Sequence, residues 1–253
     1  MTSFFAGSIA LATVFLFGCV GEIITEKAGH LNLGIPGIMC VGTAGGCFAV
    51  SVYMSALSDP NNASWFLLVL LSILTAAVFA AALGGIYAVL TVTLRCNQNI
   101  TGLAITIFGN GFAQFFMDTC VLTSDVDRAN FEVAGKVMSR GLPFADSLGA
   151  FGKIFLSHGI LVYLSIAIAI LAAWFLKKTR AGLHLRAVGE SPATADAAGI
   201  NVTAYKYCAI LAGSGIAGLG GYFYIIDYIK GSWENAATIE ALGWLSIALV
   251  IFN

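Results

Sequence analysis

The chain alternates between long apolar runs and short polar segments. Six of the runs approach or exceed the roughly 20 residues that an α-helix needs to cross a bilayer. A seventh run, of about 11 residues, is too short to cross. The pattern therefore predicts an all-α, polytopic transmembrane helical bundle with six complete spans and a truncated seventh. The runs are 4–20, 36–57, 65–94, 99–117, 158–176 and 207–226, followed by the partial run 242–252.

Composition supports this class and excludes others. Hydrophobic residues make up 59% of the chain and charged residues 10%, whereas soluble domains average about 25% charged residues. The six cysteines lie mostly in apolar runs, with no C-x-x-C pair and no metal-ligand spacing, so we expect neither a disulfide framework nor a metal site. Nucleotide-binding and hydrolase motifs are also missing, so we expect no catalytic site and no cofactor on this chain. A net charge of −1 gives no indication of nucleic-acid binding.

The polar segment 177–206 sets the predicted orientation. It carries five of the twelve basic residues: Lys177, Lys178, Arg180, Arg186 and Lys206. Positive charge beside membrane spans stays in the cytoplasm. Counting spans from this cytoplasmic loop places segment 118–157 and the N-terminus outside. We treat 1–253 as a single transmembrane domain and expect the sequence to be truncated at its C-terminus.

The same segment predicts a short helix of its own. Ser191 is a good N-cap and Pro192 suits the first helical position. The stretch 193–198 is rich in alanine, and Gly199 suits the left-handed position that ends a helix. Glu190 adds negative charge at the positive end of the helix dipole. Such a helix is suited to binding by a cytoplasmic partner protein. The alternative interpretation is that the segment is an ordinary ordered loop.

The fourth run carries a row of polar side chains. Asn99, Thr106, Asn110 and Gln114 are spaced by seven, four and four residues, which places them on one helical face. Unpaired amides are costly in lipid, so this face should look toward other helices or water. It either lines a translocation pathway or makes hydrogen bonds between helices.

Glycines interrupt the pattern at two other places. Four glycines, with Asn32 and Pro36, make a continuous helix unlikely over 21–37, where we expect an inner loop or a broken helix at the pathway. Glu22, Glu26 and Lys27 favour a membrane-surface position for the first half of this stretch. Five glycines in 213–221 also predict a local break in the sixth span. The six spans otherwise lack internal ionisable residues, which argues against a proton-driven carrier.

Two motifs resemble a known family. The first reads GE…E..G.LNLG..GIM..G from Gly21 to Gly42, and the second reads RAVGESPATADAAGINV from Arg186 to Val202. They resemble the inner-membrane permease subunits of ABC importers in the branched-chain amino acid and simple-sugar group, and most of all the nucleoside or simple-sugar permeases. His30, Pro36 and Thr106 stand where the family often has other residues, so the resemblance does not specify the substrate.

The resemblance implies a set of partners and roles. It implies a bacterial inner-membrane importer of two permease chains, two ATPase subunits that bind ATP and magnesium, and an external substrate-binding protein, all surrounded by lipid. Helix 192–198 would be the coupling helix seated in the ATPase. A stand-alone carrier or facilitator for a neutral solute is the alternative function, and a membrane scaffold is a third. The family's ATPase-contact positions carry over to Glu190, Ala195, Asp196 and Gly199, and its pathway motif to Glu22, Asn32, Gly34 and Gly37.

Overall fold

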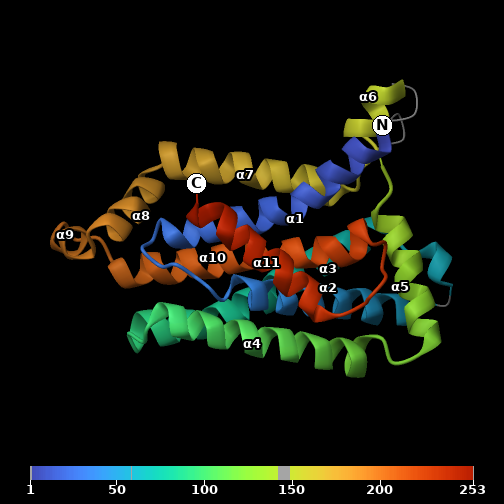
Figure 1. Ribbon diagram of the computed structural model, residues 1–253, viewed down its shortest axis with the longest axis horizontal. Coiled ribbons are helices and arrows are strands. Elements are labelled where there is room, and N and C mark those ends of the chain that lie inside the picture. The colour runs from blue at the N-terminus through green and yellow to red at the C-terminus, as the bar shows by residue number, and fades with distance from the viewer. Residues whose placement is uncertain (1, 58, 142–148, 253) are drawn as a thin grey trace.

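The computed structural model describes residues 2–57, 59–141 and 149–252 (Figure 1). Over these residues it is helical, and six helices are long and apolar enough to cross a membrane, which confirms the predicted polytopic bundle. The part of the predicted external segment at 142–148 lies outside the described residues. The six are α1 (Thr2–Glu26), α2 (Ile35–Ser55), α3 (Trp65–Ala88), α4 (Gln98–Phe116), α7 (Ile160–Lys178) and α10 (Val202–Phe223).

Shorter elements join and extend these six helices. Three of the long helices end in a π-helical turn, which lengthens them beyond the regular helix. These turns are η2 (Val89–Thr93), η3 (Met117–Val121) and η5 (Tyr224–Tyr228). The remaining elements are η1 (Pro60–Asn62), α5 (Asp125–Met138), α6 (Gly149–Phe155), α8 (Arg180–Glu190), α9 (Pro192–Ala197) and α11 (Ala236–Ile251).

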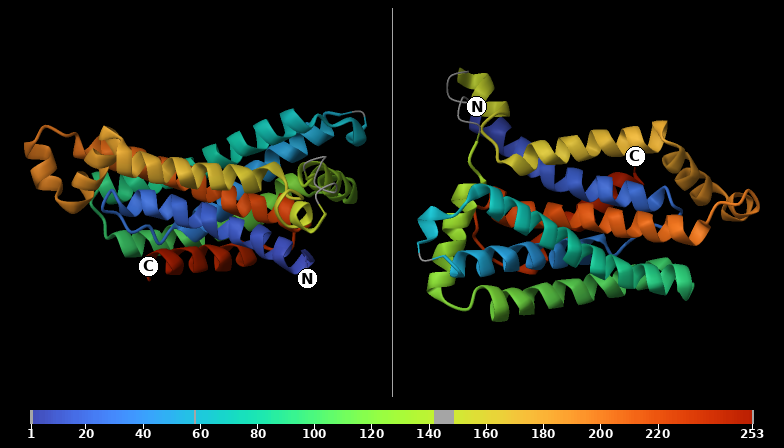
Figure 2. Two further views of the ribbon diagram at one scale, coloured as in Figure 1. Left: turned by 90° about the horizontal axis from the view of Figure 1, so that it is seen from above. Right: turned by 180° about the vertical axis from the view of Figure 1, so that it is seen from behind.

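The two ends of the bundle differ in what they carry. Helices α8 and α9 project beyond the bundle at one end, where the α1–α2 connection and the start of α4 also lie (Figure 1). Helix α5 and the N-terminus lie at the opposite end, as the views from above and behind also show (Figure 2). This is the alternation that the apolar runs predict, because each span reverses the direction of the chain.

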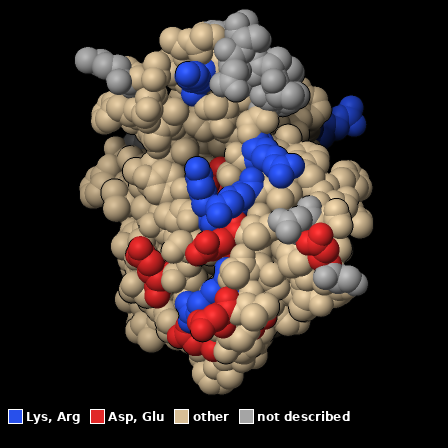
Figure 3. Space-filling model, turned by 90° about the vertical axis from the view of Figure 1, so that its right-hand side faces the viewer, with Lys and Arg blue, Asp and Glu red and all other residues tan. Residues whose placement is uncertain are grey.

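The end with α5 presents charges of both signs (Figure 3). Helix α5 is amphipathic: it buries Phe131 and Val137, while its exposed side carries alternating charges. Ser124 caps it, because its side chain accepts a hydrogen bond from the backbone N–H of Asp127. Hydrogen bonds from Thr123 and Ser124 in turn lower the pKa of the Asp127 carboxyl. The exposed charged residues of the α5 region are Asp125, Arg128, Glu132, Lys136 and Arg140.

Helices α2 and α10 form the centre of the bundle, and glycines let them approach closely. A Cβ on Gly42 would lie 2.5 Å from the Cα of Gly218, and Gly46 packs on the ring of Tyr222. Small residues permit such contacts where lipid supplies no hydrophobic drive between helices. The predicted break at 213–221 is wrong: α10 is continuous there, because its glycines serve as contact points for neighbouring helices.

The outer helices keep large apolar side chains on their free faces. Leu74 of α3 is 58% exposed, Ile107 of α4 is 75% exposed and Ile170 of α7 is 64% exposed. Broad exposure of such side chains is unfavourable in water but matches a hydrocarbon surrounding. The chain is therefore a multi-pass membrane protein with lipid-facing surfaces on α3, α4 and α7.

The first span differs most from the prediction. Helix α1 continues to Glu26, six residues past the predicted end at residue 20, and only residues 27–34 are irregular. The predicted surface position for the start of this stretch is wrong for Glu22, whose side chain is fully buried. Gly21 does not break the helix, because it packs directly on the backbone of Gly213 in α10. The span therefore contains an internal ionisable residue, contrary to expectation.

Replacing Gly42 should weaken the α2–α10 contact. We expect Gly42→Val to cost about 1–3 kcal/mol of stability or more, because the new methyl groups would meet the backbone of α10. The measurement is the midpoint of thermal unfolding of the purified protein in detergent. Gly111→Val is the matched control, since a Cβ there meets nothing within 4 Å. Equal midpoints for the two variants would contradict the proposed role of Gly42 in packing.

Candidate functional site

Helix α8 carries the polar segment away from the bundle. The Thr179 hydroxyl caps it by accepting a hydrogen bond from the N–H of Gly182 at 3.0 Å. Gly182, Leu185 and Val188 form its buried face. Sequence reasoning missed α8, although the cap and the three-residue spacing of these buried positions were available as signals.

Helix α9 forms as predicted at the tip of this segment. It covers Pro192–Ala197, with Ser191 at the N-cap position. The Ser191 hydroxyl bonds to the Thr194 hydroxyl at 2.7 Å rather than to a backbone N–H. Gly199 adopts φ +80°, the left-handed conformation expected of it, and its N–H donates to the carbonyl of Asp196. The helix is therefore defined at both ends by local contacts.

The four predicted ATPase-contact residues differ in exposure. Glu190, Asp196 and Gly199 are exposed at the projecting end of the molecule, where another protein could reach them. Ala195 is buried and faces the chain itself. The three exposed positions are accessible from outside the molecule, while Ala195 is covered by the chain itself.

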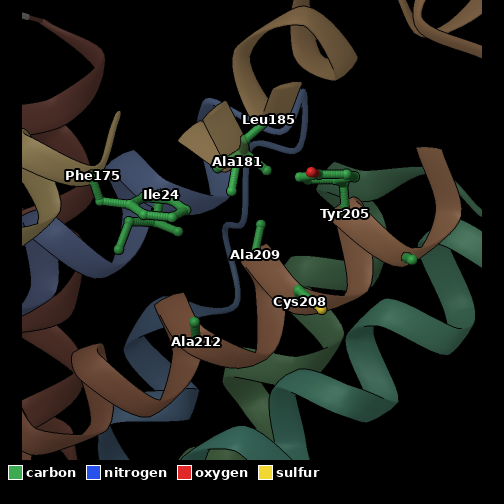
Figure 4. Close-up of a pocket in the computed structure, with 9 residues that line it drawn as sticks. Ile24, Phe175, Ala181, Leu185, Tyr205, Cys208, Ala209 and Ala212 are labelled. Atoms are coloured by element: carbon green, nitrogen blue, oxygen red, sulfur yellow. The ribbon is translucent and has the colours of Figure 1, made fainter. Parts of the chain in front are cut away.

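An apolar cavity of about 350 Å³ separates α8 from the bundle (Figure 4). Ala181 and Leu185 of α8 face it from one side, and Tyr205 and Ala209 of α10 from another. The hydroxyl of Tyr205 lies 3.1 Å from Nδ1 of His184, which links α8 to α10 near the cavity. Helix α8 is therefore not packed uniformly on the bundle. Ile24, Phe175, Ala204, Cys208 and Ala212 complete the lining.

The α1–α2 connection, residues 27–34, is held by buried polar groups. The Glu22 carboxylate accepts a hydrogen bond from the backbone N–H of Asn32 at 2.8 Å. The Asn32 side-chain oxygen accepts one from the N–H of Gly34 at 2.9 Å. Both side chains are fully buried. Glu22 and Asn32 thus satisfy backbone groups that have left the helix.

His30 lies in the same connection and is almost completely buried. Burial, with a smaller contribution from the positive charge of Lys206, lowers the pKa of His30 to about 4. The imidazole is therefore neutral at pH 7 and adds no charge to this part of the protein.

The end of the connection packs against α4. A Cβ on Gly34 would lie 2.9 Å from Cγ2 of Ile105, and one on Gly37 would lie 2.6 Å from the Cα of Thr106. The Thr106 hydroxyl donates to the carbonyl of Leu33 at 2.8 Å. Gly34, Gly37 and Thr106 are therefore brought together by close backbone approach, and Asn32 lies beside them.

The remaining residues of the polar row have other surroundings. The Asn110 amide donates to the Glu240 carboxylate of α11. Gln114 donates to Asp118 at 2.6 Å and accepts from the N–H of Ala236 at 2.9 Å. Each of these two amides therefore bonds to residues outside α4.

Asn99 stands apart from that row. It is exposed in the first turn of α4, where its N–H donates to the side chain of Asn97. Sequence reasoning missed Glu240, Tyr87 and Gln98 as polar partners in this region. Their partners lie 56 to 130 residues away in the chain, so no local pattern reveals them.

Several known proteins with similar sequences are named as ABC transporter permease proteins. The chain is 30% identical over 251 residues to the nucleoside ABC transporter permease protein NupC of Lactococcus lactis subsp. cremoris, covering 98% of this chain and 74% of NupC. It is 31% identical over 256 residues to TsgC13 of Haloferax volcanii, which is provisionally named a glucose ABC transporter permease protein. The aligned region covers 99% of this chain and 71% of TsgC13. It is 26% identical to the guanosine ABC transporter permease protein NupQ of Bacillus subtilis, covering 97% of this chain and 73% of NupQ.

No solved structure matches this chain. The family model described as the permease component of branched-chain amino acid transport systems matches residues 4–252. This match extends over nearly the whole sequence, including both motifs and all the helices described above except the first two residues of α1. The chain therefore belongs to the permease-component family of branched-chain amino acid transport systems.

Proposed function

We propose that this chain is a permease subunit of an ATP-binding cassette importer. It forms the pathway for a small polar solute, a nucleoside in the first place and a simple sugar in the second. It couples to a separate ATPase subunit, which binds ATP and magnesium, through the tip formed by α9. ATP hydrolysis takes place on that partner and not on this chain.

The observation that carries this proposal is the projecting, well-defined helix α9. Glu190, Asp196 and Gly199 are exposed on this tip, within the stretch 186–202 that resembles the family. A helix this short is marginal on its own, so the Ser191–Thr194 bond at its start, the left-handed Gly199 at its end and the adjoining α8 suit a defined contact with another protein. The basic residues of 177–206 favour a cytoplasmic location for this end, where an ATPase would be reached.

The choice of solute rests on the names of the relatives and on the chemistry of the polar row. NupC and NupQ are named for nucleoside and guanosine transport, and TsgC13 for glucose. Amide and hydroxyl groups suit neutral polar solutes. We therefore assign Asn32, Gly34, Gly37, Asn99, Thr106, Asn110 and Gln114 to the surroundings of the pathway.

The other partners follow from the same proposal. A second permease chain, identical or related, completes the pathway in the bacterial cell membrane. An external substrate-binding protein delivers the solute to the opposite end, which carries α5. The mixed charges on that end offer groups of both signs for such a contact (Figure 3).

A stand-alone carrier is the second candidate, and buried Glu22 favours it. Ionisable groups inside spans are the usual proton-handling groups of such carriers. Glu22 lies within α1 and is fully buried. The two candidates differ in whether uptake depends on ATP.

Purification in mild detergent from native membranes separates the two candidates. We expect an ATP-binding cassette subunit to co-purify, identified by mass spectrometry, because the exposed α9 surface is proposed to hold it. A chain that purifies alone, with adenosine uptake unaffected by depletion of cellular ATP, would favour the stand-alone carrier.

Changes in α9 should uncouple transport from ATP hydrolysis. Asp196→Arg reverses the charge of an exposed contact residue, and Gly199→Val forces a branched residue into a left-handed conformation that costs about 1–2 kcal/mol. We expect each to lower ATP-driven uptake by about tenfold, the effect of roughly 1.4 kcal/mol at the contact. Uptake of labelled adenosine and ribose is measured at matched membrane levels. Wild-type uptake in both variants would remove the assignment of α9.

Asn110→Leu tests the polar row. The change removes the amide that donates to Glu240 and replaces it with an apolar group. We expect the ratio of adenosine to ribose uptake to change, and this ratio is independent of the amount of protein in the membrane. An unchanged ratio with only a lower protein level would assign Asn110 a structural role.

A further inference from the structure

The α1–α2 connection touches both the segment that carries α9 and the helix that carries the polar row. At one end, Gly29 lies against Gly189 near the end of α8: a Cβ on Gly29 would lie 3.2 Å from the Cα of Gly189. A Cβ on Gly189 would in turn lie 3.0 Å from the backbone nitrogen of Gly29 and against the carbonyl oxygen of Lys27. The backbone of α8 at Gly189 therefore contacts the backbone of the α1–α2 connection directly, with no flexible side chain between them.

Between its ends, α8 packs on the bundle through Leu185, which is buried in an apolar cluster with Ala28 and Ala209. The cavity of about 350 Å³ lies between α8 and the bundle (Figure 4). A second close contact lies near its start, where a Cβ on Gly182 would be 2.8 Å from the Cα of Leu176 in α7. Helix α8 is thus held closely near both ends, by α7 at one and by the α1–α2 connection at the other. A displacement of α9 would reach the bundle through these contacts.

At its other end, the connection is tied to α3 and α4. The backbone N–H of Leu31 donates to the Gln98 side chain at 3.2 Å, and the Tyr87 hydroxyl donates to the carbonyl of Leu31 at 3.0 Å. The carbonyl of Leu33 accepts from Thr106 at 2.8 Å. These bonds join residues 31–33 to the start and the middle of α4, and to the end of α3.

The connection is also braced internally. Glu22 holds the backbone of Asn32, and the Asn32 side chain holds the backbone of Gly34. Both side chains are fully buried, so water does not compete for these bonds. These buried hydrogen bonds therefore restrict the backbone of residues 31–34.

We propose that residues 27–34 transmit movement of α8 and α9 to α4. Gly29 receives the displacement from Gly189, and the bonds at Leu31 and Leu33 pass it to the helix that carries Thr106, Asn110 and Gln114. Glu22, Tyr87 and Gln98 are positioning residues that keep the connection stiff and attached. The inference rests on the proposed function, because it assumes that an ATPase moves α9.

Three variants weaken this transmission at different points. Tyr87→Phe removes the hydroxyl that bonds Leu31, Gln98→Leu removes the acceptor of the Leu31 N–H, and Gly189→Ala places a Cβ against the connection. Tyr163→Phe is the matched control, because that hydroxyl also donates to a backbone carbonyl at 3.0 Å, that of Phe155. Glu22→Leu removes the acceptor of the Asn32 N–H.

The experiment uses the complete complex purified with its ATPase and reconstituted in liposomes. It measures the uptake of labelled adenosine and ribose for each ATP hydrolysed. We expect Tyr87→Phe and Gln98→Leu to lower this ratio by about threefold or more, the size expected from one net hydrogen bond. The rate of ATP hydrolysis should stay within about twofold of wild type. Gly189→Ala and Glu22→Leu should act in the same direction, while Tyr163→Phe retains the wild-type ratio.

Each outcome decides the inference. A wild-type complex that moves neither adenosine nor ribose on ATP hydrolysis would contradict the proposed function, and the inference with it. A coupled wild-type complex whose variants keep the wild-type ratio would overturn the inference alone. If Tyr87→Phe and Gln98→Leu lose ATP hydrolysis and uptake in parallel, these bonds are structural and the inference is also overturned.

Discussion

The polar backbone of residues 27–34 must find its hydrogen-bond partners within the protein, and this constraint organises the bundle. Buried backbone N–H and C=O groups need hydrogen-bond partners, and those of a segment that has left the helix must find them elsewhere in the protein. Here the partners come from three helices: Glu22 from α1, Tyr87 from α3 and Gln98 from α4. Shifting any of these helices would leave a buried polar group unpaired, at a cost of about 1–3 kcal/mol. The connection therefore fixes the relative positions of helices that are distant in the sequence.

Close packing at the centre serves the same arrangement. Because lipid is as apolar as the helices, association depends on contact and hydrogen bonding rather than on burial from water. Gly42 and Gly218 bring α2 and α10 together, and Gly21 and Gly213 do the same for α1 and α10. Large apolar side chains such as Ile107 and Ile170 are left on the outside. The distribution of small and large residues thus separates protein-facing from lipid-facing surfaces.

Features set by local sequence could be predicted, and features set by distant contacts could not. Uninterrupted apolar runs were enough to place the six spans, and Ser191 with Gly199 was enough to place α9. Glu22 was misplaced because its burial depends on the backbone of Asn32, ten residues later. The glycines of α10 suggested a break because their packing partners, such as Gly42, lie far away in the chain. For the polar row, helical period identified a shared face, but Glu240 as the partner of Asn110 depends on how α11 folds back.

Buried Glu22 and the exposed tip formed by α9 differ in how strongly they bear on the function of the chain. Buried Glu22 suggests proton handling, yet one of its oxygens already has a structural role in holding the Asn32 backbone. Its burial is thereby explained in part without any transport of protons. At the tip formed by α9, Gly199 has a structural role because it ends the helix, whereas the side chain of Asp196 is exposed. An exposed Asp196 on this ordered tip fits the proposed contact with a second protein better than it fits a carrier that acts alone.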